Sequence, residues 1–339
     1  MLVSAPHCTI STMIFRTEIH PKSSVFQISH AKHGLTIGSC FSDSIGEQLE
    51  RSKFPLMCNP LGVVYNPVSV YTALQILCGT KQIAEQDLWC DHGVWKSYLL
   101  HSSFASTHKH EVLEHCTEVQ NRFATEFQTL DYCIITLGTA WVYELIATGE
   151  VVNNCHKTPA KLFHRKQLSV SEITAALTQS IELLQSINPN VQIICTISPV
   201  RHWNDGAHEN QVSKSLLFVA LDELLKTTKN THYFESYELL MDDLRDYRFY
   251  ENDLLHPNSQ AIEYIWQAFS KTYFSAETHT IIQHVQALHK AMQHRPFQPM
   301  SSEYAAFCAK QLELCDTLVR RFPYINVQKE KEFFTTKKQ

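Results

Sequence analysis

Two short segments of the chain carry residue types that can perform covalent acyl chemistry. The first is Gly38-Ser39-Cys40-Phe41, which follows a short apolar run and places two candidate nucleophiles on a tight turn before a predicted helix. The second is Asp253-Leu254-Leu255-His256, which places a carboxylate three residues before an imidazole. On a turn, this spacing lets the carboxylate hold one ring nitrogen while the other takes a proton from a nucleophile. The two segments together supply a nucleophile, a base and a group that orients the base.

Cys40 and Ser39 are both candidates for the nucleophile. The positive end of the predicted helix and its backbone amides are expected to lower the pKa of the Cys40 thiol. Ser39 is the alternative nucleophile, and its structural role would be to cap the helix. Because neighbouring residues of a strand point to opposite faces, only one of the two is expected to face His256. The competing structural roles are packing for Cys40 and helix capping for Asp253.

Alternating strand and helix patterns surround these segments. Apolar runs predict strands at 35–37, 54–57, 132–137, 191–197 and 233–234. Amphipathic spacing and capping residues predict helices at 45–52, 68–77, 171–187, 209–225 and 259–269. Parallel strands need long crossovers, so this order predicts an α/β fold, a three-layer α/β/α sandwich with a parallel sheet. Ligands of such sheets bind where strands end, which is where the chemistry-bearing segments fall.

The remaining segments divide the chain further. Residues 13–275 are predicted to form the catalytic domain, in which the histidine-rich segment 80–130 contains no clear core element and is predicted to be an insertion that shapes a pocket. Residues 276–328 show two amphipathic helices and predict a helical appendage, the C-terminal helical extension of the fold. Residues 1–12 and 329–339 are predicted to be a disordered extension and a disordered tail.

Composition excludes several classes of protein. The 339 residues include 29 Lys or Arg and 34 Asp or Glu, a net charge of −5, so the basic excess of a nucleic-acid-binding protein is absent. No run approaches the roughly 20 apolar residues of a membrane span. Eleven cysteines without a CxxC pair indicate reduced thiols and predict a cytoplasmic protein. The nine glycines form no phosphate loop, and His108-Lys109-His110 lacks a third ligand, so neither a cofactor nor a metal is expected.

The order of these motifs resembles the SGNH hydrolase superfamily of esterases and acyltransferases, and more closely the GSCFA family. The resemblance extends over about residues 15–269. One departure is Ser42, where the motif that names the family has alanine. The resemblance implies an SGNH hydrolase-like fold and ester chemistry without supplying a substrate. It rests on several separate motifs, among them Ile37-Gly38-Ser39-Cys40-Phe41, Asn59-Pro60-Leu61-Gly62, Leu137-Gly138-Thr139-Ala140-Trp141, Ser198-Pro199-Val200-Arg201-His202 and Leu244-Arg245-Asp246-Tyr247-Arg248-Phe249-Tyr250.

The resemblance to the superfamily implies roles for individual residues. The first superfamily block reads Gly-Asp-Ser, and lining up the glycines places Cys40 on the nucleophile, which implies a triad of Cys40, His256 and Asp253. The Gly-x-Asn-Asp block becomes Gly138-Thr139-Ala140-Trp141, which lacks the asparagine that helps bind an oxyanion. Replacement donors are the amides of Cys40 and Gly62 together with Asn66 or the Thr139 hydroxyl, and the sequence leaves this choice open.

Four further residues are predicted to face the same edge of the sheet. His156, Lys157, Arg201 and His202 suit a polar or anionic acyl substrate, although structural salt bridges would explain them equally well. The predicted function is covalent hydrolysis or transfer of an acyl group from an ester or thioester of a small molecule or glycan. The alternative is a catalytically degenerate protein of the same fold that binds a glycan or acyl ligand. The sequence does not specify the oligomeric state.

Overall fold

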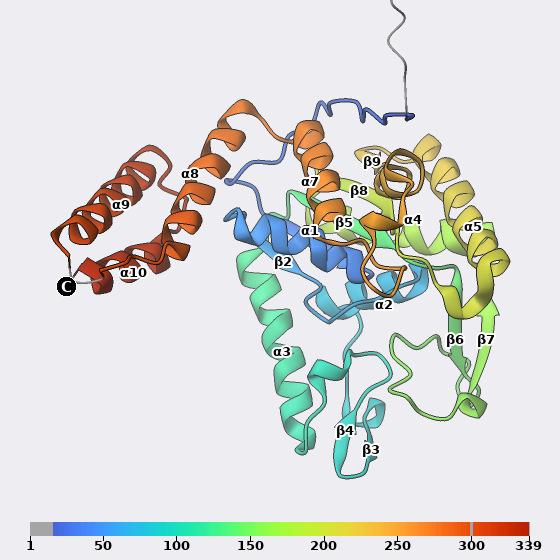
Figure 1. Ribbon diagram of the computed structural model, residues 1–339. Coiled ribbons are helices and arrows are strands. Elements are labelled where there is room, and N and C mark those ends of the chain that lie inside the picture. The colour runs from blue at the N-terminus through green and yellow to red at the C-terminus, as the bar shows by residue number, and fades with distance from the viewer. Residues whose placement is uncertain (1–15, 299–300, 339) are drawn as a thin grey trace, which may run out of the picture.

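The computed structural model describes residues 16–298 and 301–338. Its centre is a sheet of five parallel strands in the order β2-β1-β5-β8-β9 (Figure 1). The predicted parallel α/β fold is confirmed, and the five predicted strands agree with the observed ones to within about two residues. The strands are β1 (Gly34–Gly38), β2 (Leu56–Cys58), β5 (Tyr132–Leu137), β8 (Gln192–Ile197) and β9 (Thr231–Phe234).

Helices cover both faces of this sheet because its central strands are apolar on both sides. In β5, Cys133, Ile135 and Leu137 belong to one buried cluster, whereas Tyr132 and Ile134 belong to a second cluster on the opposite face. The second cluster is completed by α1 (Cys40–Arg51) and α7 (Ser259–Tyr273). The first is completed by α2 (Pro67–Leu77), α3 (Lys109–Glu126), α4 (Val170–Ile187) and α5 (Gly206–Thr227).

The expectation that segment 80–130 contains no core element is wrong. It contains the hairpin of β3 (Trp89–Asp91) and β4 (Val94–Lys96) and the long helix α3, which buries Val112, Cys116 and Phe123 in the first core cluster. A second hairpin that was not predicted, β6 (Trp141–Leu145) and β7 (Phe163–Gln167), follows the end of β5. Both hairpins extend from the same side of the molecule (Figure 1).

The C-terminal helices form a third apolar cluster beside the sheet domain (Figure 1). They are α8 (Ala276–Gln293), α9 (Ser302–Arg321) and α10 (Gln328–Lys338). The predicted disordered tail is therefore wrong over 329–338, because α10 packs Phe334 into the cluster with an exposed fraction of 0%. The predicted extension at 1–12 lies outside the described residues. None of the helices in the described ranges is long and apolar enough to cross a membrane.

Candidate active site

The turn between β1 and α1 fixes the position of Cys40. Gly38 has a φ of 145°, and a Cβ atom there would lie 2.1 Å from the carbonyl oxygen of Thr136 on the neighbouring strand, so glycine is required. The Gly38 amide donates to Asn59 Oδ1 at 2.8 Å, and the Ser39 amide donates to the Thr136 carbonyl at 3.1 Å. Ser39 is the N-cap residue of α1, which makes Cys40 its first helical residue.

The structure brings Cys40, His256 and Asp253 together in a chain of polar contacts. Cys40 Sγ lies 3.6 Å from His256 Nε2, and His256 Nδ1 lies 2.5 Å from Asp253 Oδ2. Asp253 Oδ1 accepts hydrogen bonds from the backbone amides of His256 and Leu255, each at 2.9 Å. These bonds lower the pKa of Asp253 to about 2, so the carboxylate is ionised and orients the imidazole through Nδ1. The Nε2 atom then faces the thiol as a proton acceptor.

The expectation that the pKa of the Cys40 thiol is lowered is wrong. Burial raises the pKa of Cys40 above its ordinary value, and the negative charge of Asp43 raises it further. The backbone amides at the start of α1 and the charge of Lys214 lower this pKa, but they do not outweigh burial. In the resting protein the thiol is therefore neutral, and forming a nucleophile requires transfer of its proton to His256 in the course of the reaction.

Ser39, the alternative nucleophile, lines the same cavity as Cys40 but forms no hydrogen bond with His256. Its side chain is buried, with an exposed fraction of 1%, and within the described residues its hydroxyl has no hydrogen-bond partner. Its Cβ lies beside Gly138, 3.3 Å from the position that a Gly138 Cβ would occupy. The structure thus pairs His256 with Cys40, while Ser39 faces the loop after β5.

Most of the backbone amides near the site, including that of Gly62, already donate hydrogen bonds within the protein. The Gly62 amide donates to the Asn59 carbonyl at 2.7 Å, and the amides of Gly138 and Thr139 both donate to the Tyr65 carbonyl, at 2.8 and 3.0 Å. These three amides are therefore not free to bind an oxyanion. The Cys40 amide remains, because the first residue of a helix has no intrahelical acceptor.

The two predicted side-chain donors are engaged as well. Asn66 is the N-cap of α2, where its Oδ1 accepts from the Ser69 amide at 2.8 Å and its Nδ2 donates to the Ser69 hydroxyl at 3.1 Å. The Thr139 hydroxyl lies 3.0 Å from Ser213 Oγ and accepts from the Trp141 amide at 3.1 Å. Both residues line the cavity, but their bonds indicate a structural role.

His202 places a neutral imidazole next to Gly138. Its Nε2 lies 3.4 Å from the position of a Gly138 Cβ, and its ring meets the Tyr65 ring edge-on at a centroid distance of 5.7 Å. The backbone amide of His202 donates to Asn210 Oδ1 at 2.9 Å, which fixes the residue. Burial, with the charge of Lys214, lowers the pKa of His202 to about 4, so the imidazole is neutral. A neutral imidazole carries one N–H that can donate into the cavity.

Arg201 is occupied with the loop that carries Asp253 and His256. Its Nη2 donates to the Leu254 carbonyl at 2.6 Å, and its guanidinium lies over the rings of Trp203 and Tyr250, at 4.9 and 5.4 Å from their centroids. Leu254 itself has a φ of 60°, a conformation that a leucine seldom adopts without external support. Arg201 therefore positions the loop from Asp253 to His256.

The structure does not bring His156 and Lys157 into the cavity. His156 Nε2 makes a 2.7 Å hydrogen bond with the Ser97 carbonyl, and neither residue is among those that line the cavity. Both have positive φ values, 49° and 58°, in a tight turn. Their neighbours Asn154 and Cys155 face the cavity instead.

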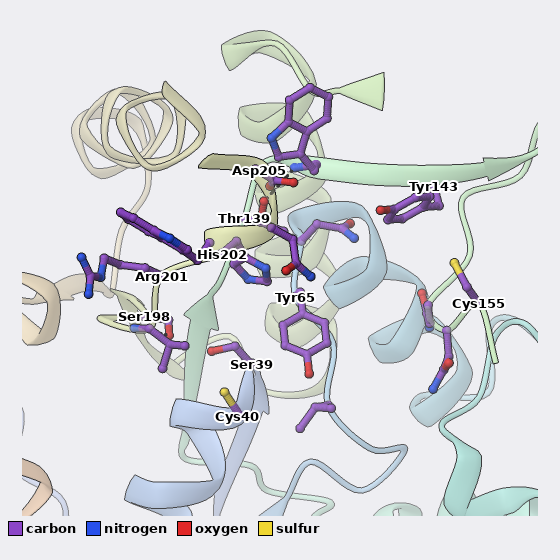
Figure 2. A pocket seen from close by; sticks show the side chains of 18 of the residues that line it. Ser39, Cys40, Tyr65, Thr139, Tyr143, Cys155, Ser198, Arg201, His202 and Asp205 are labelled. Atoms are coloured by element: carbon purple, nitrogen blue, oxygen red, sulfur yellow. Dashed lines mark hydrogen bonds between the residues drawn. The ribbon is translucent and has the colours of Figure 1, made fainter. Parts of the chain in front are cut away.

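The cavity in front of Cys40 has a volume of about 540 Å³ and an aromatic and polar lining. In Figure 2, Arg201 and Ser198 lie on one side of Tyr65, and Tyr143 and Cys155 lie on the other. Part of the wall comes from segment 80–130, which the sequence predicts to shape a pocket and which contributes His101. Another part comes from the β6–β7 hairpin, which was not predicted and contributes Trp141, Tyr143 and Arg165. No cluster of three or more potential metal ligands occurs in residues 16–298 and 301–338.

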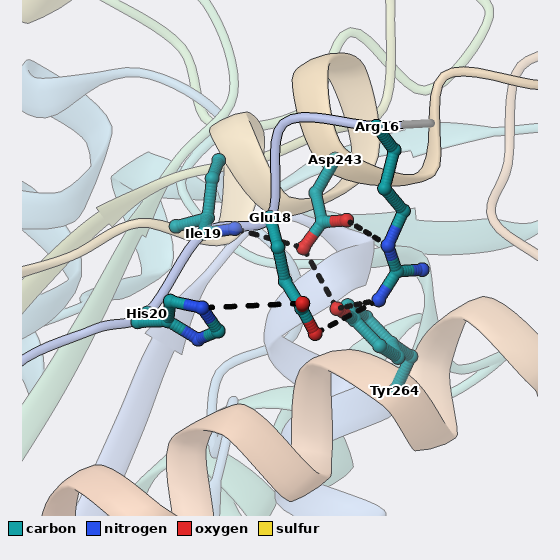
Figure 3. A network of polar contacts seen from close by, with 6 residues as sticks. All are labelled: Arg16, Glu18, Ile19, His20, Asp243 and Tyr264. Carbon is teal, nitrogen blue, oxygen red and sulfur yellow. Dashed lines mark hydrogen bonds and ion pairs between the residues drawn. The ribbon is translucent and has the colours of Figure 1, made fainter. Parts of the chain in front are cut away.

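A second polar network holds the segment that leads to the loop of Asp253 and His256 (Figure 3). Asp243 is buried, with an exposed fraction of 3%, in the π-helical segment Leu239–Leu244. It accepts hydrogen bonds from the Tyr264 hydroxyl at 2.7 Å and the Ile19 amide at 3.1 Å, and it pairs with Arg16 at 3.4 Å. Because Tyr264 belongs to α7, the network joins both flanks of the loop that bears Asp253 and His256.

A sheet of five parallel strands with helices on both faces defines an α/β protein, and a chain of contacts joins Cys40, His256 and Asp253. The model of the GSCFA family matches residues 34–269, and that of the GSCFA domain protein, C-terminal domain, matches residues 285–338. The chain belongs to the GSCFA family, as its motifs predict. The comparison with curated proteins gives no match.

Two solved structures that match this chain at low identity are a carbohydrate esterase and an acetyl xylan esterase. A carbohydrate esterase family 3 protein from Talaromyces cellulolyticus is 12% identical with a TM-score of 0.34, over 76% of this chain and 99% of its own. An acetyl xylan esterase from the rumen bacterium Butyrivibrio proteoclasticus is 10% identical with a TM-score of 0.37, and the match covers 70% of this chain and 62% of the esterase.

Proposed function

We propose that this GSCFA protein cleaves or transfers the acyl group of an ester or thioester through a covalent intermediate on Cys40. One observation carries the proposal: the continuous contact from Cys40 Sγ to His256 Nε2 at 3.6 Å and from His256 Nδ1 to Asp253 Oδ2 at 2.5 Å. A nucleophile, a base and an orienting carboxylate in this order are the components of covalent acyl chemistry.

The proposed reaction has two halves. In the first, the Cys40 proton passes to His256 Nε2, sulfur bonds to the acyl carbon, and the leaving alcohol or thiol departs with the proton from His256. In the second, water or an acceptor hydroxyl gives its proton to His256 and attacks the thioester, which restores the Cys40 thiol. Hydrolysis and transfer differ only in which acceptor reaches the acyl-enzyme.

The oxyanion is assigned to the Cys40 amide and the neutral His202 imidazole. The pocket supports a small-molecule or glycan ester as substrate, because its aromatic walls provide flat apolar surfaces and its polar residues provide hydrogen bonds. This oxyanion site takes the place of the asparagine that the sequence lacks at Gly138-Thr139-Ala140-Trp141.

Trapping the intermediate tests the proposal directly. The protein is mixed with a p-nitrophenyl ester and with an acyl thioester, quenched rapidly in acid, and mapped by peptide mass spectrometry. The expected result is an acyl group on Cys40 that neutral hydroxylamine removes, as a thioester requires. An active preparation that carries its acyl group on Ser39, or none on either residue, would contradict the assignment, and the second outcome would favour attack by water activated at His256.

A second candidate function is binding without turnover. It is favoured by the raised pKa of Cys40 and by the engagement of the predicted oxyanion donors in structural hydrogen bonds. In this case the ester and thioester panel yields neither product nor adduct, whereas acylated glycans raise the melting temperature of the protein. Turnover that is lost in Cys40→Ala excludes this candidate.

A further inference from the structure

One histidine lines the cavity without a role in the proposed reaction. His101 packs against Gly62, whose lack of a side chain allows the close approach. Two residues after this glycine, the Val64 amide donates to the Gly38 carbonyl at 2.9 Å, in the turn that carries Cys40. The segment that supports His101 is therefore bonded to the turn of the proposed nucleophile.

Local hydrogen bonds fix the tautomer of the His101 ring. His101 is the N-cap of the short 3₁₀ helix Ser102–Phe104, where its Nδ1 accepts from the Ser103 amide at 3.2 Å and lies 3.0 Å from the Ser103 hydroxyl oxygen. A backbone N–H can only donate, so Nδ1 is the acceptor and the neutral ring carries its proton on Nε2. Within residues 16–298 and 301–338, Nε2 has no hydrogen-bond partner. It is the ring nitrogen that can donate to a ligand.

Asn154 offers a second donor on the same wall of the cavity. The amides of Asn153 and Asn154 both donate to the Tyr98 carbonyl, at 2.9 and 3.1 Å, which joins their segment to the one that leads to His101. The Oδ1 atom of Asn154 accepts from the His156 amide at 2.8 Å, and this bond fixes which end of the amide is oxygen. In the described part of the chain its Nδ2 has no partner, and the residue lines the cavity.

Tyr143 of β6 completes this wall with an aromatic ring. It lines the cavity with an exposed fraction of 39%. Its carbonyl accepts from the Val152 amide at 2.8 Å, which bonds the β6–β7 hairpin to the segment that contains Asn154. In Figure 2, Tyr143 and Cys155 lie on the same side of Tyr65. Three segments that are distant in the sequence thus form one continuous wall.

The distal wall, which we define as His101, Tyr143 and Asn154, contains no lysine, arginine or acidic side chain. The guanidinium of Arg165 lies 5.8 Å from the centroid of the Tyr143 ring, but it forms an ion pair with Asp205, which compensates its charge. Two N–H donors beside an aromatic ring suit the hydroxyl oxygens and the flat apolar face of a sugar ring. A carboxylate or phosphate would instead require a cation that is free to pair with it.

We propose that the distal wall binds an uncharged polyhydroxyl group, a sugar ring, as the part of the ester substrate that lies away from the scissile bond. His101 Nε2 and Asn154 Nδ2 donate hydrogen bonds to its hydroxyl oxygens, and the Tyr143 ring packs against its apolar face. The inference rests on the proposed function, because the ester bond of this sugar is the one that reacts at Cys40. It narrows the substrate to an ester of an uncharged saccharide.

Two replacements of His101 test its hydrogen bond to the sugar. His101→Asn keeps an acceptor for the Ser103 amide but has no donor at the position of Nε2, whereas His101→Gln can place its amide nitrogen near that position. The value of kcat/KM for 3-O-acetylglucose, divided by that for p-nitrophenyl acetate, should fall about 3-fold to 10-fold in His101→Asn and recover in His101→Gln. His164→Asn, at an exposed position of β7 that does not line the cavity, is the matched control and should keep the wild-type ratio.

Tyr143→Leu carries the test if His101→Asn does not fold. The Tyr143 side chain is partly exposed, so its replacement leaves the core intact, and loss of the flat ring should lower the same ratio. The charge of the sugar is tested with 3-O-acetylglucuronate, which differs from 3-O-acetylglucose by a carboxylate. It should react with a kcat/KM at least about 3-fold lower, because the distal wall offers the carboxylate no cation.

Binding to Cys40→Ala separates the subsite from the reaction. Titration calorimetry with 3-O-acetylglucose should give a Kd that rises about 3-fold to 10-fold when His101→Asn is added. No binding, a Kd that this change leaves unaltered, or a preference for 3-O-acetylglucuronate would overturn the proposal. Binding that depends on His101 in a protein whose wild type forms no acyl adduct at Cys40 would keep the subsite and reject the proposed function. An adduct at Cys40 with unchanged ratios in His101→Asn and Tyr143→Leu would reject the subsite alone.

Discussion

The Nε2 atom of His256 lies 3.6 Å from the Sγ atom of Cys40, although 216 positions separate the two residues in the chain. Each residue sits at the N-terminal end of a helix: Cys40 begins α1, and His256 lies three residues before α7 begins at Ser259. Both helices pack on the same face of the sheet through one cluster that contains Leu49 and Ile265. The proximity of the thiol and the imidazole therefore follows from the packing of α1 beside α7.

Asp253→Asn should remove most of the activity while the fold is retained. The amide oxygen can still accept the backbone hydrogen bonds of the loop, but the amide nitrogen donates to Nδ1 and leaves the imidazole in the wrong tautomer. We expect kcat to fall on the order of 10³-fold or more, as at the corresponding aspartate of serine proteases. Steady-state kinetics on the ester panel, with Asp222→Asn on the exposed side of α5 as control, measures this. Turnover close to wild type would remove Asp253 from the mechanism.

Ser39 and Cys40 should respond differently to replacement by alanine. Cys40→Ala should abolish the acyl adduct, because the sulfur is the atom within reach of His256. Ser39→Ala should keep the adduct and reduce the rate by roughly 10-fold at most, through the loss of a buried hydroxyl beside Gly138. Intact-mass measurements after rapid quench compare the two variants. An adduct that survives in Cys40→Ala would transfer the nucleophile role to Ser39.

The central fold could be predicted because its strands are apolar runs bounded by turn residues. The predicted strand 132–137 is β5, and 191–197 differs from β8 by one residue. The contact between Cys40 and His256 also followed from the sequence, since both residues stand where parallel strands and their crossover helices place ligands.

Other parts of the site could not be predicted, and the reasons are physical. His101 reaches the cavity because Gly62, at a φ of 87°, has no side chain, and a Cβ there would lie 2.1 Å from the His101 Cβ. No periodic pattern encodes such an approach. Lys214 is a charged residue that would be expected at the surface, but it is fully buried in α5. The pKa of Cys40 depends on how deeply its thiol is buried, which the sequence does not specify.

The stability of the protein should depend on the protonation of His202 at acidic pH. Its folded pKa of about 4 lies below the ordinary value of about 6.5, so between these values the unfolded chain binds a proton that the native protein does not. From pH 7 to pH 4 the free energy of unfolding should therefore fall by up to about 3 kcal/mol from this group. Above pH 7 the contribution vanishes, because the imidazole is neutral in both states.

His202→Gln should flatten this dependence. Urea unfolding at pH 7.0 and at pH 4.5 should give a smaller loss of stability in His202→Gln than in the wild type. His92→Gln, whose side chain is 96% exposed, is the matched control and should retain the wild-type slope. Equal slopes in all three proteins would show that His202 is not held neutral by burial.

The docking of α10 should depend on Glu330. This residue is buried, with an exposed fraction of 3%. Its Oε1 lies 2.7 Å from Nζ of Lys53, a residue that follows α1, and 3.4 Å from Nε2 of His289 on α8. Glu330→Gln leaves the cation of Lys53 without its partner, and breaking a buried ion pair in this way destabilises by roughly 3 kcal/mol. We expect α10 to lose hydrogen-exchange protection before the sheet domain does, because the α8–α10 cluster is separate from the two sheet clusters. Glu313→Gln, an exposed change on α9, should leave protection as in the wild type. If Glu330→Gln kept the protection of α10 as well, the apolar contacts around Phe334 alone would hold the helix in place.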